Sequence, residues 1–191
     1  MVRPPEAVVS VAEAWARIEA RLRTQQPDAL RDLPGGADPA EIARVEAELG
    51  VSLPEDARAS YRLHNGSGGI WVCEQGFLMP LTAPGSGPLP NHGVLDLWRM
   101  MAQVGDAMAA ERSTPVGPIR ADWWHPKWVP LTENESGDFV CLDLAPAAGG
   151  RVGQVIDWWH EQGATRVLAG SFGEWLASLA EPGAAADGPR L

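Results

Sequence analysis

The residues best suited to chemistry or binding gather in one short segment of the second half of the chain. Trp123-Trp124-His125-Pro126-Lys127-Trp128 places three tryptophans within six positions, interrupted by a proline. They cannot all point to one side of a regular element. If Trp128 begins a strand packed on the core, Trp123 or Trp124 must lie elsewhere, for example on an exposed surface. Exposed aromatic side chains of this size are typical anchors for a protein partner. The alternative is that they cap the sheet against the helices.

Carboxylates and histidines follow this segment and raise the question of a metal site. They are Asp138, Asp143, Asp157 and His160, with His125 before them. The two histidines lie far apart, without an H-x-H or H-x-x-x-H spacing, so we expect no metal site. Asp143 lies within an apolar run, where a buried carboxylate must accept hydrogen bonds from a neighbouring loop. Asp138 follows a glycine and is typical of a turn-closing residue. We therefore expect structural roles for Asp138 and Asp143.

Nucleophile motifs are weak in this sequence. Ser171 begins an S-x-x-E capping box with Glu174 and is explained as a helix N-cap, with Trp175 facing inward. Cys73 and Cys141 have no neighbouring histidine or basic residue that would lower their pKa. The chain has no G-x-S-x-G, P-loop or dinucleotide fingerprint. We expect no catalytic residues and no cofactor.

The cysteines and the N-terminal sequence bear on the compartment. The two cysteines lie in separate apolar runs without metal spacing, so we expect two reduced core residues and no disulfide. No export signal and no window approaching a membrane-spanning helix is present. We expect a soluble, cytoplasmic protein.

The charge of the chain restricts its partners. The formal net charge is −10, which argues against nucleic acid or an anionic membrane, because both require clustered lysine and arginine. An acidic surface permits a basic protein partner, although it also serves solubility alone. Asp157, His160 and Glu161 flank a predicted turn and are, with Trp123, Trp124 and His125, the candidate partner-binding residues. The near absence of lysine indicates a GC-rich bacterial genome.

The order of the predicted elements is helices first and antiparallel strands afterwards, which indicates an α+β fold. Helices are predicted over 10–23, 38–50, 54–64 and 94–112, and from Ser171 onward. Their predicted caps include Asp38, Glu41 at the capping-box position, and Gly50. Strands are predicted at 70–72, 77–79, 128–132, 139–144, 154–159 and 166–169. We expect a flexible lead-in at 1–9, one domain at 10–181 and a disordered tail at 182–191.

Several short motifs in a fixed order resemble the SUKH superfamily. They occupy residues 38–50, 53–54, 63–66, 128–131, 136–138, 141–144, 153–156 and 171–176. The segment from Thr82 to Arg120 matches poorly. The resemblance implies an α+β fold with a central, mostly antiparallel sheet flanked by N-terminal helices and a C-terminal helix. Bacterial members are frequently immunity proteins that neutralise toxins, fungal members act in cell-wall signalling, and no shared catalytic machinery is implied.

Three functional hypotheses follow from these patterns and the resemblance. The first is a non-enzymatic, immunity-type protein that binds a basic toxin such as a nuclease, with Trp124 as its aromatic anchor. The second, which rests on the resemblance, is a cytoplasmic regulator or scaffold linked to cell-wall assembly. The third is a small hydrolase that uses His125, His160 and an aspartate. The sequence names neither the partner nor an oligomeric state.

Overall fold

The structure, a computed structural model, describes residues 9–73, 76–83, 92–134 and 136–181. Apart from Val9, the expected lead-in at 1–9 and tail at 182–191 lie outside these residues. The helices are α1 (Val11–Gln25), α2 (Pro27–Asp32), α3 (Pro39–Leu49), α4 (Glu55–Leu63), α5 (Val94–Ala107) and α6 (Phe172–Leu179). The strands are β1 (Trp71–Cys73), β2 (Gly76–Leu78), β3 (Trp128–Pro130), β4 (Thr132–Glu133), β5 (Phe139–Asp143), β6 (Gln154–Trp159) and β7 (Gly163–Ala169). The α+β prediction is confirmed.

The strands form two antiparallel sheets, one of order β1-β2-β4 and one of order β3-β5-β6-β7. The prediction of one continuous strand over 128–132 was wrong, because the chain changes sheets at Leu131. The Leu131 amide donates to Val140 in one sheet at 2.7 Å, and its carbonyl accepts from Met79 beside the other at 2.9 Å. The preceding Pro130 lies on an edge strand, where its missing N–H costs no ladder hydrogen bond.

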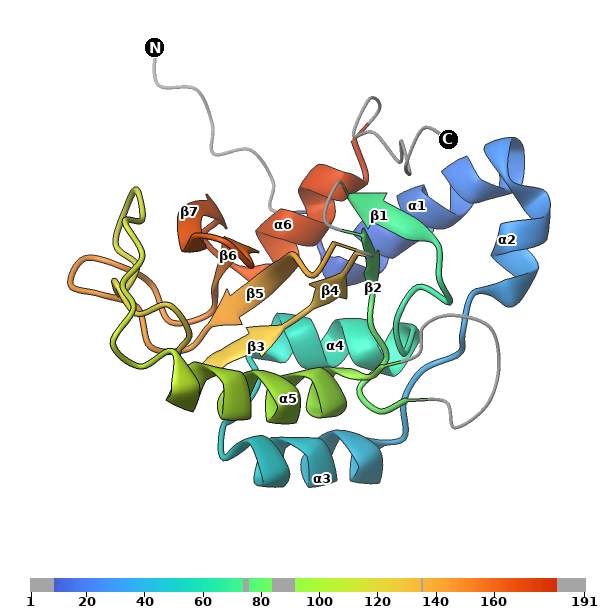
Figure 1. Ribbon diagram of the computed structural model, residues 1–191. Helices are drawn as coiled ribbons and strands as arrows, with labels where there is room; N and C mark the ends of the chain where they lie inside the picture. Colours follow the sequence, from blue (N-terminus) through green and yellow to red (C-terminus); the bar gives the residue numbers. More distant parts are fainter. Residues whose placement is uncertain (1–8, 74–75, 84–91, 135, 182–191) are drawn as a thin grey trace, which may run out of the picture.

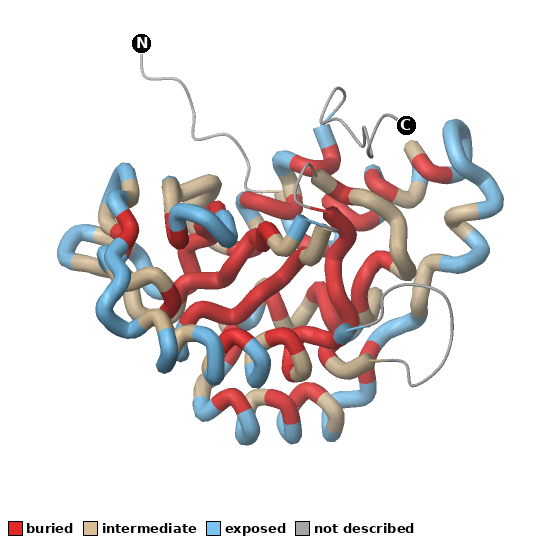
Figure 2. The backbone as a smooth tube through the Cα atoms, viewed as in Figure 1, coloured by how far each residue is buried: buried red, intermediate tan, exposed pale blue. Residues whose placement is uncertain are grey.

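The helices cover the sheets in two groups (Figure 1). Helix α5 packs on β3 and α3 packs on α5, whereas α6 packs on β6 and β7 and also contacts α1 and α4. Buried residues fill β2, β3, β5, most of β6 and the inward helix faces, as the red tube in Figure 2 shows, whereas β1 and β7 are only partly buried. All residues of β5 are buried, so both faces of the larger sheet are covered at its centre.

Local cap signals explain where most helices begin and end. Asp38 caps α3 by accepting from the Ala40 amide at 2.7 Å, and Gly50 ends it in the left-handed conformation with φ 64°. The capping-box role predicted for Glu41 was wrong, because its carboxylate instead accepts from the Thr82 hydroxyl at 2.6 Å. The helix thereby gains a link to the residues that lead toward α5.

Two other helical predictions need correction. No element was predicted from Pro27 onward, because of the prolines and glycines in this segment. The structure forms the short helix α2 there. Helix α5 ends at Ala107 instead of Arg112, and Val104 on its predicted inner face is 39% exposed. The residues after Ala107 turn away and form one wall of the site described below.

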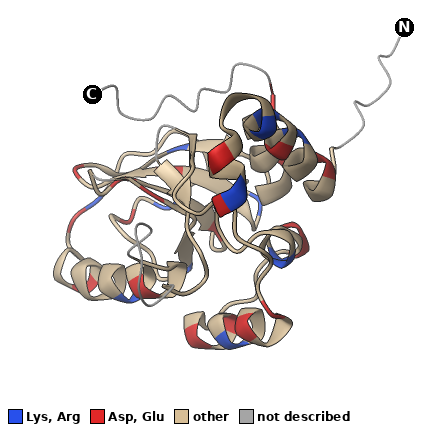
Figure 3. Ribbon diagram, turned by 90° about the vertical axis from the view of Figure 1, so that its right-hand side faces the viewer, with Lys and Arg blue, Asp and Glu red and all other residues tan. Residues whose placement is uncertain are grey.

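Charged residues of both signs are interspersed along the helices, as Figure 3 shows. Many of them pair within one helix or with a neighbouring helix, as Arg44 pairs with Glu48 and Arg58 pairs with Glu46. Within the described residues, no helix is both long and apolar enough to cross a bilayer.

Candidate partner-binding site

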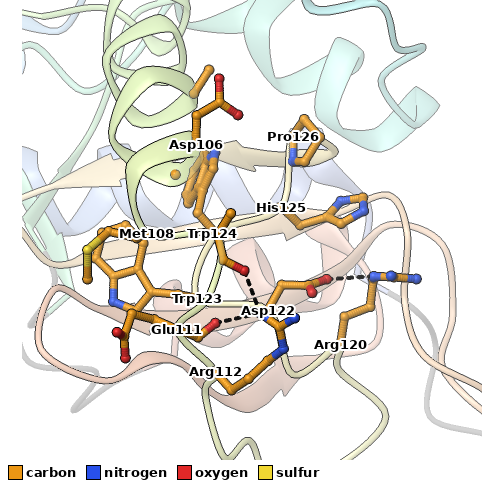
Figure 4. A pocket seen from close by; sticks show the side chains of 13 residues that line it. Asp106, Met108, Glu111, Arg112, Arg120, Asp122, Trp123, Trp124, His125 and Pro126 are labelled. Carbon is orange, nitrogen blue, oxygen red and sulfur yellow. Dashed lines mark hydrogen bonds and ion pairs between the residues drawn. The ribbon is translucent and has the colours of Figure 1, made fainter.

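A pocket of about 300 Å³ lies between the end of α5 and the segment 120–126. Figure 4 shows it from close by. One wall comes from the last turn of α5 and the residues after it, including Gly105, Asp106, Met108, Glu111 and Arg112. The other wall comes from the tryptophan-rich segment, including Arg120, Asp122, Trp123, Trp124 and His125. Three of the six predicted partner-binding residues, Trp123, Trp124 and His125, therefore come together here.

Hydrogen bonds from three directions hold the second wall in place. The Trp98 indole on α5 donates to the Pro126 carbonyl at 2.8 Å, and the Trp158 indole donates to the Trp123 carbonyl at 2.7 Å. The Ser113 hydroxyl donates to the Asp122 carbonyl at 2.9 Å. Because each bond fixes a backbone carbonyl, the wall is set by the fold before any partner arrives.

The tryptophans beside the pocket form an edge-to-face cluster centred on Trp158. Trp124 meets Trp128 at 6.2 Å and Trp158 at 5.8 Å between ring centroids, and Trp123 meets Trp158 at 5.0 Å. Of the two alternatives left open by the sequence, Trp124 follows the second: it is only 8% exposed and caps the sheet against α5, so it is not an exposed anchor. Gly105 makes this possible, since a Cβ there would lie 2.7 Å from the Trp124 ring. Trp123 is the half-buried member of the pair.

His125 is held in its neutral form at the basic side of the pocket. Burial is the main cause that lowers its pKa below 6.5, and the positive charge of Arg120 lowers it further. Its Nδ1 lies 3.1 Å from the Lys127 amide and accepts that hydrogen. The neutral ring therefore carries its proton on Nε2. This arrangement suits a hydrogen-bond donor better than a proton-transfer base at neutral pH.

The charged groups of the pocket differ in how far they are already satisfied. Arg120 pairs with Asp122 at 2.8 Å, and Arg112 donates to the carbonyls of Ala109 and Glu111 at 2.7 and 2.8 Å. Asp106 and Glu111 are exposed, and their carboxylates have no hydrogen bond or ion pair to any described residue. The pocket therefore offers two carboxylates that are free to accept a partner's donors.

The buried Asp143 has the structural role predicted for it. Its carboxylate accepts from the Ala145 amide at 2.9 Å, the Gln154 amide group at 2.9 Å and the Trp128 indole at 3.1 Å. Burial raises the pKa of Asp143, and these three hydrogen bonds oppose the rise. The Gln154 side chain also donates to the Pro118 carbonyl at 3.1 Å, which ties the loop before the pocket to the sheet.

The remaining predicted residues lie away from the pocket. Asp138 accepts from the His160 amide at 3.1 Å and lies 2.9 Å from its Nδ1, which closes a turn against the end of β6. The prediction that Asp157 is a surface acid was wrong. Its side chain is 2% exposed and pairs with Arg166 at 3.3 Å. Alternation of side chains along β6 predicts one exposed face, but both faces of this strand are covered. Glu161 is exposed as expected, but it does not line the pocket.

The candidate nucleophiles are engaged in the fold. Ser171 accepts from the Glu174 amide at 3.2 Å, which confirms the N-cap of α6, while the Glu174 carboxylate binds the Gly170 amide at 2.9 Å. Cys73 and Cys141 form no disulfide with each other, as predicted, but only Cys141 is a fully buried core residue and Cys73 is half-buried. Cys141 is fully buried, and burial together with nearby carboxylates raises the pKa of its thiol well above the usual value. Among the described residues, no group of histidines, cysteines and acids could hold a metal ion.

Sequence reasoning missed the first wall of the pocket, namely Asp106, Met108 and Glu111. These residues lie in the segment from Thr82 to Arg120 that matches the SUKH pattern poorly. One signal could have found Asp106: a helix whose last turn carries an acid and no basic residue is unfavourable without a counter-ion. The return of the chain from Arg112 to Asp122, which closes the pocket by an antiparallel bridge, leaves no such local signal.

Comparison with known proteins gives a consistent result. The model of the SMI1/KNR4 family (SUKH-1) matches residues 36–178. The chain is 30% identical over 183 residues to the "Cell wall biosynthesis/cell cycle regulator smi1" of Schizosaccharomyces pombe, which covers 89% of this chain and 35% of the relative. It is 25% identical over 208 residues to the "Glucan synthesis regulatory protein" of Neurospora crassa, covering 90% of this chain and 38% of that protein.

A further relative is the "Cell wall assembly regulator SMI1" of Saccharomyces cerevisiae, 24% identical over 206 residues, with 87% of this chain and 39% of the relative covered. The chain thus spans between a third and two fifths of the length of these curated relatives.

Proposed function

The chain belongs to the SMI1/KNR4 (SUKH-1) family, and from this premise we propose that it is a non-enzymatic protein-binding module with a regulatory role in cell-wall assembly. The observation that carries the proposal is the pocket beside α5, which the fold builds in advance and leaves with two free carboxylates. A preformed pocket with unsatisfied polar groups loses little entropy when a partner binds.

The non-enzymatic part of the proposal is supported by the side chains that could react, because each of them already has a structural role or is buried. Ser171 is used as a helix cap, Asp143 accepts three hydrogen bonds inside the core, and the Cys141 thiol is buried with a raised pKa. A nucleophile needs exposure and a base within hydrogen-bond reach. Neutral His125 accepts the Lys127 amide through Nδ1, so this nitrogen is already engaged.

The regulatory role has better support than the immunity role, because the relatives named above carry names of cell-wall or glucan-synthesis regulators. Toxin neutralisation is a second candidate function. The free carboxylates in the pocket favour it, since a nuclease must present a basic groove to hold phosphates. That observation fits either role, and the names of the relatives favour the regulator.

A chimera in fission yeast tests this function. The segment of the Schizosaccharomyces pombe regulator that aligns with this chain is replaced by the chain, in a strain whose own gene is removed. Growth is measured on a dye that binds the cell wall, with the same regulator lacking the segment as the control. We expect the chimera to restore growth and the control to fail. A chimera that is expressed at the normal level and grows no better than the control would contradict the proposed function.

A further inference from the structure

We propose that the acidic lining of the pocket, with Asp106 at the end of α5 and Glu111 beside Met108 and Trp123, receives an arginine side chain of the protein partner. The inference rests on the proposed function only in taking the occupant to be part of a protein. The ligand chemistry follows from the pocket itself, which joins free carboxylates to an aromatic ring and a thioether.

The Asp106 and Glu111 carboxylates have no ion pair with a neighbouring described side chain. Asp106 and Glu111 are two of only three described carboxylates that have no hydrogen bond or ion pair within the described residues, Asp32 being the third. The two arginines that also line the pocket hydrogen-bond elsewhere: Arg120 pairs with Asp122, while Arg112 donates to neutral backbone carbonyls and keeps its positive charge in the lining. A cation in the pocket therefore meets carboxylates that lose no existing partner when they bind it.

The position of Asp106 adds an independent electrostatic argument. It lies in the last turn of α5, where the helix dipole presents its negative end, and this turn carries no basic residue. A carboxylate at this end is repelled by the carbonyl dipoles, whereas a cation is attracted by them. The Arg112 guanidinium donates a hydrogen bond to the Ala109 carbonyl, which lies beyond the end of the helix. The Asp106 carboxylate itself has no counter-ion among the described residues. A bound cation would supply the missing charge at this helix end.

The shape of the pocket favours a planar guanidinium on a flexible stem. Figure 4 shows Met108, Trp123 and Glu111 together on one side of the pocket, with Arg120, His125 and Pro126 on the other. A guanidinium stacks on an indole face and also donates to a carboxylate in a fork, which an ammonium group cannot do. A volume of about 300 Å³ is at the lower limit for small-molecule sites and fits a single side chain.

A buried donor in the adjacent wall points to the same occupant. The Trp124 indole nitrogen has no acceptor among the described residues, although the residue is more than nine-tenths buried. An unused buried donor is costly. The protein itself covers this nitrogen, so a carbonyl oxygen of the segment that carries the arginine reaches it only when the Trp124 ring or the end of α5 shifts. Binding should therefore move the Trp124 ring, with the arginine side chain against Trp123.

Nuclear magnetic resonance of the nine tryptophan indole groups tests the inference directly. The labelled chain is titrated with N-acetyl-arginine amide and, in parallel, with N-acetyl-citrulline amide, which has the same shape without the charge. We expect saturable shifts of the Trp123 and Trp124 indole signals with the arginine compound alone. Glu111→Gln should weaken this binding about fivefold, the effect of one exposed ion pair.

Asp32→Asn is the matched control, because it removes one charge from a carboxylate that is equally free but lies on α2, outside this pocket. It should leave the affinity unchanged. Equal shifts with the citrulline compound, no saturable shift at either indole, or equal weakening by the control would overturn the inference. If arginine binds while the yeast chimera fails, the proposed function is wrong and the cation site stands. If the chimera grows while arginine does not bind, the cation site is wrong and the proposed function stands.

Discussion

The carboxylate of Asp143 and the two free carboxylates of the pocket beside α5 differ in exposure and in the hydrogen bonds that they accept. Asp143 has no exposed surface and accepts three hydrogen bonds, from Ala145, Gln154 and Trp128. Asp106 and Glu111 are exposed and accept none from the described residues. The two regions are close in the fold, since Trp128 packs against Trp124, which lines the pocket.

This difference separates structural polar groups from groups available for binding. A buried polar atom must find a partner inside the protein, because leaving it unsatisfied is costly. A free carboxylate at a preformed pocket has the opposite property, since its partner is supplied from outside. Substitutions in the first region should therefore change stability, and substitutions in the second should change binding alone.

The largest effect is expected at the centre of the sheet. Asp143→Ala should lower the free energy of unfolding by about 3 kcal/mol, because two buried donors and one partly buried amide lose their acceptor at once. Urea unfolding followed by tryptophan fluorescence measures this loss. A loss below about 1 kcal/mol would show that the hydrogen bonds to Asp143 do not stabilise the fold, and the contrast between Asp143 and the pocket carboxylates would then not hold.

A smaller loss is expected at the cap of α6. Ser171→Ala should cost about 1 kcal/mol of stability, because the Glu174 amide loses its acceptor. Ser171→Asp keeps an acceptor at the same position and should remain close to the parent protein. The measurement is again the urea midpoint. Equal stability of the alanine variant and the parent would contradict the assignment of Ser171 as a cap.

The pH dependence of stability sharpens the account of Asp143. Its folded pKa is raised by burial above the usual value of 3.8, so the folded state binds the proton more tightly than the unfolded state. This contribution favours folding most below the unfolded pKa and is lost as pH rises through the folded pKa. The parent should therefore gain stability relative to Asp143→Asn as pH falls from neutrality toward 3.8. A difference that is constant over this range would contradict the raised pKa.

The smallest effect on stability is expected in the pocket. Asp106→Asn should leave the free energy of unfolding unchanged or raise it by up to about 0.5 kcal/mol, because it removes a negative charge from the negative end of α5. Glu111→Gln should stay within about 0.5 kcal/mol of the parent. A loss above about 1 kcal/mol in either variant would show that these carboxylates have structural partners.

Features that depend on neighbouring residues could be predicted from the sequence. Asp38, Gly50 and Ser171 mark helix ends because each cap is made within a few residues of itself. The change of sheet at Leu131 could not be predicted, since it depends on which distant strands bind its amide and carbonyl. The SUKH resemblance predicted the family and the α+β class correctly, although not the division into two sheets.

The candidate site was predicted only in part, for a related reason. Trp123, Trp124 and His125 line the pocket, as a cluster of adjacent residues in the sequence suggested. The burial of Trp124 depends on Gly105, a contact between separate elements that no local pattern records. Asp157 was misplaced because strict alternation cannot assign an exposed face to a strand that is covered on both sides.

The yeast chimera with an altered pocket tests the central claim most directly, namely that the free carboxylates beside α5 bind the partner. Asp106→Arg with Glu111→Arg reverses both charges in the pocket. Asp28→Arg with Asp32→Arg makes the same change in net charge on α2. We predict that the first pair abolishes growth on the cell-wall dye and that the second pair preserves it, at equal protein levels. Equal growth of the two double variants would contradict the claim.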